Sequence, residues 1–199
     1  MKPKRHKPSG DEAALDAARD CVLAVGVRRT TLTDVARRAG VSRMTLYRRW
    51  PDVRALVGDL MTREWLAAAR GALPAADDPR PAREQLVEGL TDGARALREH
   101  PLFRKILDVD PELLLPYVLD RRGASQDALL EQLAQGLRAG HADGSVREDD
   151  PVRQARVLLL VVQSFTLSLR TMTDESDARL DTPAFEAELR HVLDRSLRP

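Results

Sequence analysis

The chain has 199 residues, which is enough for one large domain or two small ones with a substantial core. Hydrophobic residues make up 43% and charged residues 32%, proportions that argue against a disordered chain. The net charge of +1 hides an asymmetry, because residues 1–54 contain 13 Lys and Arg against 6 Asp and Glu, whereas residues 55–199 contain 19 against 25. This asymmetry is expected if only one end meets a polyanion, although chance clustering on a solvated surface would give the same counts.

The single cysteine, Cys21, excludes a disulfide within the chain. It stands in an apolar helical pattern, so we expect it in a core. The longest apolar run, residues 157–162, is too short to span a bilayer, and no apolar segment follows the basic start as it would in a signal peptide. We therefore expect a cytoplasmic protein with no membrane partner.

Residues 1–10 form a basic, proline-containing arm without apolar periodicity, which predicts disorder. This arm could follow a minor groove or a phosphate backbone, or it could remain a solvated tail. The next segment, residues 11–25, is predicted to be a helix that ends at Gly26. One apolar stripe at helical spacing supports it, formed by Leu15, Ala18, Val22 and Val25.

Residues 31–40 have the pattern of a short capped helix. Thr31 and Asp34 show the spacing of a capping box, in which Thr31 accepts a hydrogen bond from a first-turn amide and Asp34 reaches back to another amide. Gly40 is expected to end the helix, because glycine adopts positive φ at low cost.

A second short helix should follow the turn, with Ser42 as its cap. Leu46, Tyr47 and Trp50 recur at helical spacing, and Pro51 then forbids further regular helix. Two helices joined in this way form a helix-turn-helix, whose second helix can lie in a DNA major groove. A helix pair with a merely solvated basic face is the alternative.

The residues between the core positions are the candidates for DNA contact. At base edges we expect Arg43, Met44, Thr45 and Arg48, with Met44 able to contact a thymine methyl group. At phosphates we expect Thr31, Thr33, Arg49 and Arg54, since the start of a helix and free cations both favour anions.

The pattern GxxxTTLxDVAxxAGVSxxTLYxxWxxxRxL over residues 26–56 resembles the N-terminal domain of the TetR/AcrR family of transcriptional regulators. The match covers about the first quarter of the chain, and the rest is similar in length, helical character and placement. The resemblance implies a homodimer that binds a palindromic double-stranded operator and is released by a small molecule. It also implies that Tyr47 contacts a phosphate, although Tyr47 can pack as well. Two positions depart from the family pattern, namely Met44, where many members have Gly, Lys or Pro, and Arg54, which replaces the usual lysine.

The remainder of the chain is predicted to be helical. A helix over residues 52–71 is long enough to leave the DNA-binding domain, and in the family this helix links the ligand to the DNA. A proline-rich break follows at residues 73–81. Further helices are expected up to Glu99, in short pieces after Pro101 and Pro111 with a break at Pro116, over residues 124–139 with Gly140 as the stop, over residues 151–171, and from Pro183.

We therefore expect an all-α fold of about nine helices, with a basic arm (residues 1–10), a three-helix DNA-binding domain (residues 11–54) and a helical ligand-binding and dimerisation domain (residues 55–199). The interrupted helices could open a cavity for a mostly apolar effector. The alternative for each lining residue is ordinary core, and the candidates are Leu90, Leu97, Phe103, Leu107, Leu113, Tyr117, Leu133, Val162 and Phe165.

The helix over residues 151–171 is apolar nearly all round, so it needs cover on more than one side. We expect it to pair, together with the last helix, with the same helices of a second copy. The predicted interface contains Val157, Leu160, Val161, Leu189, Val192 and Leu193.

The sequence shows no catalytic constellation, so no enzymatic activity, cofactor or metal site is expected. The four histidines are scattered without ligand spacing, and no glycine-rich phosphate loop or Gly-x-Ser-x-Gly elbow is present. The leading hypothesis is a ligand-responsive transcriptional regulator, a repressor by family habit. An all-α enzyme or lipid-binding protein with a basic N-terminal domain is the alternative, and an activator or architectural DNA binder is a weaker one.

Overall fold

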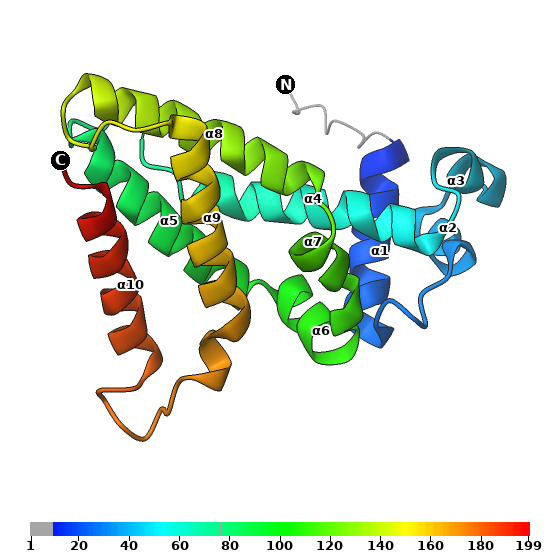
Figure 1. Ribbon diagram of the computed structural model, residues 1–199. Coiled ribbons are helices and arrows are strands. Elements are labelled where there is room, and N and C mark those ends of the chain that lie inside the picture. The colour runs from blue at the N-terminus through cyan, green and yellow to red at the C-terminus, as the bar shows by residue number, and fades with distance from the viewer. Residues whose placement is uncertain (1–9, 76) are drawn as a thin grey trace, which may run out of the picture. The chain divides into compact units, whose positions relative to one another are not determined.

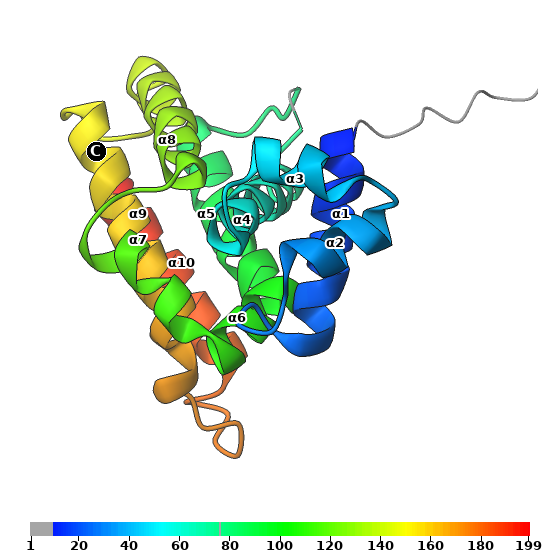
Figure 2. The ribbon, with the colours of Figure 1, turned by 90° about the vertical axis from the view of Figure 1, so that its right-hand side faces the viewer.

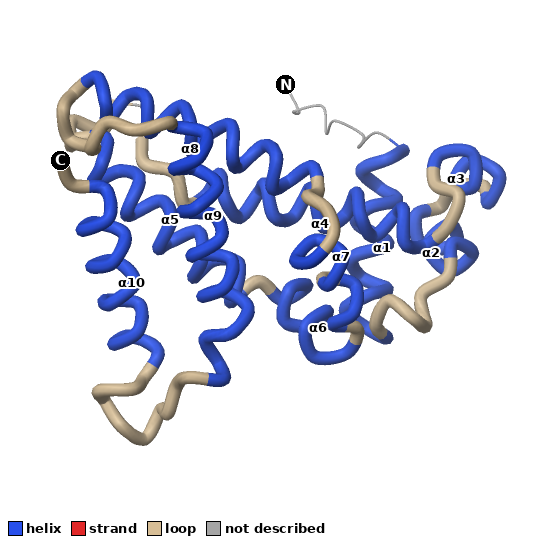
Figure 3. The backbone as a smooth tube through the Cα atoms, viewed as in Figure 1, coloured by secondary structure: helices blue, strands red, loops and turns tan. Residues whose placement is uncertain are grey.

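The computed structural model describes residues 10–75 and 77–199, and every regular element within them is a helix (Figures 1 and 3). The prediction of an all-α fold is therefore confirmed. The arm predicted for residues 1–10 lies outside the described residues, except for Gly10, which begins the first helix.

The helices follow the sequence prediction closely. In chain order they are α1 (Gly10–Val25), α2 (Leu32–Ala39), α3 (Arg43–Arg49), α4 (Val53–Gly71), α5 (Ala82–Glu99), α6 (Pro101–Val109), the 3-10 helix η1 (Pro111–Leu113), α7 (Leu115–Leu119), α8 (Ala124–Ala142), α9 (Pro151–Ser168), the 3-10 helix η2 (Leu169–Thr171) and α10 (Thr182–Leu197).

The chain forms two compact units. The first contains the described residues up to Glu64 together with Pro101–Arg122, and the second contains Trp65–His100 and Gly123–Pro199. The helix-turn-helix therefore shares its unit with α6, η1 and α7. This grouping differs from the two domains predicted from the sequence, which met between residues 54 and 55. In the first unit α2 packs against both α1 and α3 (Figure 2), and Cys21 is buried as expected.

A buried carboxylate explains why α6 belongs with the helix-turn-helix. Asp110 is fully buried at the end of α6, and its Oδ2 accepts a hydrogen bond from the backbone N–H of Val27 at 2.8 Å. The next residue, Arg28, pairs with Glu112 of η1 at 2.7 Å. Gly26 has a φ of 83°, and a Cβ there would lie only 3.0 Å from Oδ2 of Asp110. The loop after α1 is thus fixed to a segment more than 80 residues away.

The second unit is built around one apolar core from α5, α8, α9 and α10. Its buried members are Val87, Leu90, Ala94, Ala134, Leu137, Val146, Ala155, Leu158, Val162, Leu189, Leu193 and Leu197. The prediction that Gly140 ends α8 is wrong, because the helix continues to Ala142. A side-chain Cβ at position 140 would overlap Val146. This glycine therefore serves a close approach between α8 and the following loop rather than a helix end.

The stretch Pro151–Thr171 is, by length and composition alone, long and apolar enough to cross a membrane. Its buried residues include Ala155, Leu158 and Val162, which are members of the core of the second unit. A core helix of a soluble protein passes the same test of length and composition.

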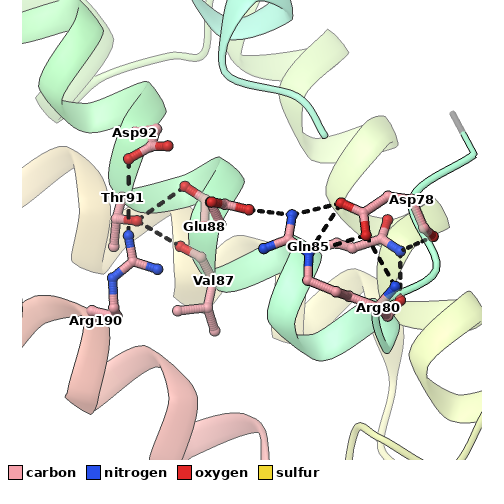
Figure 4. Close-up of polar contacts among 8 residues, drawn as sticks. All are labelled: Asp78, Arg80, Gln85, Val87, Glu88, Thr91, Asp92 and Arg190. Atoms are coloured by element: carbon pink, nitrogen blue, oxygen red, sulfur yellow. Dashed lines mark hydrogen bonds and ion pairs between the residues drawn. The ribbon is translucent and has the colours of Figure 1, made fainter. Parts of the chain in front are cut away.

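Arg80 anchors the proline-rich loop to the start of α5 (Figure 4). Its guanidinium binds both carboxylate oxygens of Asp78, which lowers the pKa of Asp78 to about 2. Gln85 adds a hydrogen bond to the backbone carbonyl of Arg80 at 2.7 Å. Further along α5, Asp92 lies 3.9 Å from Arg190 of α10, so ion pairs flank the apolar core of this unit.

Replacing Asp110 with alanine should destabilise the protein. The N–H of Val27 would then be buried without its acceptor, and we expect the free energy of unfolding to fall by about 1–3 kcal/mol. Urea unfolding followed by circular dichroism measures this change. Asp120→Ala, which removes an exposed carboxylate from the same unit, should change stability by less than about 0.5 kcal/mol. An equal loss in both variants would contradict the role of Asp110.

Candidate nucleic-acid interface

Local caps define the first helix of the helix-turn-helix. Thr31 Oγ1 accepts a hydrogen bond from the N–H of Asp34 at 3.1 Å, as predicted, and Gly40 ends α2 with a φ of 67°. The second half of the predicted capping box differs, because Asp34 accepts the Thr31 hydroxyl at 2.6 Å instead of reaching a backbone amide. This bond, assisted by Arg37 at 2.8 Å, lowers the pKa of Asp34 and keeps it ionised.

The second helix, α3, is held at both ends and in its middle. Ser42 accepts a hydrogen bond from the N–H of Thr45 at 3.1 Å and so caps the start. Leu46 and Trp50 are only 1% and 3% exposed, and they fix one side of the helix in the core of the first unit. The opposite side of this short helix must then face solvent.

The four residues of α3 that were predicted from the sequence to contact bases are all exposed. They are Arg43, Met44, Thr45 and Arg48. Met44 is 78% exposed, although methionine is among the residues most often buried in proteins. Arg43 and Arg48 form no ion pair within the described part of the chain, so their charges are open to an anion. We call these four residues the recognition face.

The candidates for phosphate contact are placed less uniformly. Thr31, Tyr47 and Arg54 are exposed, and Thr33 is half-buried. Tyr47 is 52% exposed, so about half of its surface is open to solvent.

Arg49, also predicted to contact a phosphate, is exposed but has partners within the first unit. Its guanidinium pairs with Asp11 of α1 at 3.2 Å and with Asp59 of α4 at 3.5 Å. It also lies 5.2 Å from the ring centroid of Trp50. Sequence reasoning missed these carboxylates because Asp11 is 38 residues away and nothing in the local pattern marks it as a partner.

The residues predicted to line a ligand cavity are divided between the two units. Leu90 and Val162 are buried in the core of the second unit, Leu133 and Phe165 pack against that core, and Leu97 is half-buried on α5. The remaining four, namely Phe103, Leu107, Leu113 and Tyr117, belong to the first unit.

A surface hollow of about 690 Å³ lies between the end of α4 and α5 in the second unit. Its lining includes Ala67, Leu73, Asp92, Arg95 and His100, and it contains none of the nine predicted residues. No group of three or more His, Cys, Asp or Glu side chains within residues 10–75 and 77–199 could hold a metal ion.

The residues predicted for a dimer interface fall into two classes. Val157, Leu160, Val161 and Val192 are exposed apolar side chains of α9 and α10, with Leu160 66% exposed. Leu189 and Leu193 are instead buried in the core of their own chain, because they lie on the inner side of α10. These two leucines therefore offer little surface to a partner.

Known proteins share both the pattern and the fold. Residues 14–60 match the model of the family "Bacterial regulatory proteins, tetR family". An HTH-type transcriptional regulator of Mycobacterium tuberculosis (strain H37Rv) is 40% identical over 179 residues, which are 90% of this chain and 89% of that protein.

Two solved structures are similar throughout. The transcriptional repressor QsdR of R. erythropolis, from the TetR family, aligns with a TM-score of 0.68 and 17% identity over 96% of this chain and 98% of its own. SmeT, in a complex with triclosan, aligns with a TM-score of 0.63 and 20% identity over 96% of this chain and 93% of its own. At identities of 17% and 20%, this similarity shows a common fold.

Truncating one exposed and one buried residue of α3 tests the orientation of this helix. Leu46→Ala should lower the free energy of unfolding by about 2–5 kcal/mol, because it leaves a cavity in the core. Met44→Ala should change it by less than about 0.5 kcal/mol, because Met44 touches little of the protein. Thermal or urea unfolding compares the two variants. A larger loss for Met44→Ala than for Leu46→Ala would mean that α3 is turned the other way.

Proposed function

Because the chain belongs to the tetR family of bacterial transcriptional regulators, we propose that it binds a palindromic operator as a homodimer and is released by a small molecule. Relatives in this family are transcriptional regulators, and we propose that this chain likewise acts in the cytoplasm as a repressor without catalysis of its own. The observation that carries the proposal is the recognition face, a set of exposed residues, two of them arginines unpaired within residues 10–75 and 77–199, on a helix that Leu46 and Trp50 anchor.

The recognition face has the chemistry that a major groove can read. Arg43 and Arg48 can donate paired hydrogen bonds to guanine O6 and N7, and the exposed Met44 can contact a thymine methyl group. Thr31, Tyr47 and Arg54 can bind phosphates, which supplies affinity without sequence preference. Two copies would present their α3 helices about 34–36 Å apart, in successive major grooves.

A second copy would cover the exposed apolar residues of the second unit. Val157, Leu160 and Val161 on α9, with Val192 on α10, are all exposed, although an aqueous surface disfavours a set of branched apolar side chains. Pairing α9 and α10 with their symmetry mates would bury these residues in a four-helix interface.

A small apolar molecule is the proposed effector. SmeT, which shares this fold, binds triclosan in its solved complex. In this chain Leu90, Leu133, Val162 and Phe165 supply apolar surface around the core of the second unit. An effector can shift the DNA-binding equilibrium only by its differential affinity for the two states, typically about 1–3 kcal/mol.

DNA binding is tested with a duplex selected by the protein itself from a random library, with fluorescence anisotropy as the measurement. Arg48→Ala should weaken binding by about 1–3 kcal/mol, because it removes a base contact. Arg138→Ala, the same charge change on exposed α8, should leave the affinity within about twofold. Selection of no sequence, or binding that does not weaken as salt rises, would contradict the proposed function.

Light scattering after gel filtration tests the homodimer. Leu160→Glu should convert the dimer to a monomer, because a carboxylate would be buried against apolar residues. Leu119→Glu is the matched control, since Leu119 is 72% exposed on α7, outside the proposed interface. A monomeric wild-type protein at micromolar concentration, or a dimer that survives Leu160→Glu, would exclude this interface.

A further inference from the structure

The carboxylate of Asp59 meets two groups from the end of α3. Its Oδ2 accepts a hydrogen bond from Nε1–H of Trp50 at 2.9 Å, and the same oxygen lies 3.5 Å from Nη2 of Arg49. Trp50 is the residue that ends α3, and Asp59 stands on the second turn of α4. One oxygen of α4 therefore holds both residues at this end of the proposed recognition helix.

A short helix depends on such contacts for its direction. An isolated helix needs about 12–15 residues to be even marginally stable, and α3 has only 7. The cap at Ser42 fixes the start of α3, and the buried Leu46 fixes its distance from the core. The C-terminal end is held by the buried Trp50, whose indole N–H has the carboxylate of Asp59 as its acceptor.

We propose that Asp59 is a positioning residue for DNA recognition. It orients α3 through the indole of Trp50, and it keeps Arg49 in an ion pair within the protein. This proposal rests on the proposed function, because positioning matters only if α3 reads DNA. It also gives Arg49 a role different from the phosphate contact expected from the sequence.

The neutralisation of Arg49 has a consequence for specificity. Asp11 and Asp59 both pair with Arg49, so its charge is balanced within the first unit. A free arginine beside the recognition face would add affinity for any phosphate backbone, whatever the sequence. Asp59 thereby favours discrimination between DNA sequences in two ways: it directs the base-reading side chains and restrains a cation that reads no bases.

The test compares two duplexes of equal length: one that the wild-type protein selects from a random library, and a scrambled version of it. In Asp59→Ala the affinity for the selected duplex should fall about tenfold, as expected for the loss of one hydrogen bond to a charged group. The affinity for the scrambled duplex should stay equal or rise, with a salt slope steeper by up to about 0.9. Asp16→Ala is the matched control, because Asp16 pairs with Arg63 in the same unit and carries the same charge.

Two further variants separate the two contacts of Asp59. Asp59→Asn keeps an oxygen for the indole but not the charge, so it should raise the affinity for both duplexes by a similar factor. Trp50→Phe removes the N–H donor and leaves both partners of Arg49, so it should weaken only the selected duplex. These opposite effects cannot come from a general loss of stability.

The indole proton gives a readout that does not depend on DNA. In protein labelled with 15N-tryptophan, the Nε1–H signal of Trp50, assigned by its absence in Trp50→Phe, should shift and exchange faster in Asp59→Ala. It should keep its position in Asp16→Ala. If Asp59→Ala does not fold, the same measurement is made on Asp59→Asn, in which the Trp50 signal should remain protected from exchange.

The proposal is overturned if Asp59→Ala and Asp16→Ala show the same ratio of selected to scrambled affinity, or if the Trp50 signal is unchanged in Asp59→Ala. If instead the wild-type protein binds both duplexes equally, the proposed function itself is contradicted, whatever the indole signal shows.

Discussion

Burial of Leu46 and Trp50 is the constraint on which the rest of the interface depends. These residues are four positions apart, so they project from one side of α3, and anchoring them leaves the other side in solvent. Met44 and Arg48, which are also four positions apart, are exposed on that other side for this reason, and Arg43 is exposed in the first turn. The sequence of a helix only seven residues long thus serves two purposes, packing on one side and contact with DNA on the other.

Carboxylates then decide which arginines of the first unit are available. Arg38 pairs with Asp20 of α1, and Arg49 pairs with Asp11 and Asp59, whereas Arg43 and Arg48 form no ion pair among the described residues. Exposed pairs of this kind contribute little to stability, so their main effect is on where positive charge remains. Within residues 10–54, positive charge that no ion pair balances therefore remains on Arg43 and Arg48 of the recognition face and on the exposed Arg29 and Arg54.

The features predicted correctly from the sequence are those that depend on neighbouring residues. Thr31 and Ser42 cap α2 and α3, and Gly40 has the positive φ of a helix end, because each acts within a few residues of itself. Gly140 is also a glycine near a helix end, but its contact with Val146 in the loop after α8 decides its role. Other features depend on chain segments far apart, namely the ion pair between Arg49 and Asp11, the burial of Leu189 and the placement of Phe103 in the first unit. Spacing within a helix carries no signal for such contacts.

Methylation interference on the selected duplex tests most directly whether the recognition face reads a major groove. Methyl groups at guanine N7 lie in the major groove, and those at adenine N3 lie in the minor groove. We expect N7 methylation to block binding at two groups of positions about one helical turn apart, as two α3 helices in successive major grooves require. Interference confined to adenine N3, or absent from both grooves, would show that α3 does not enter the major groove.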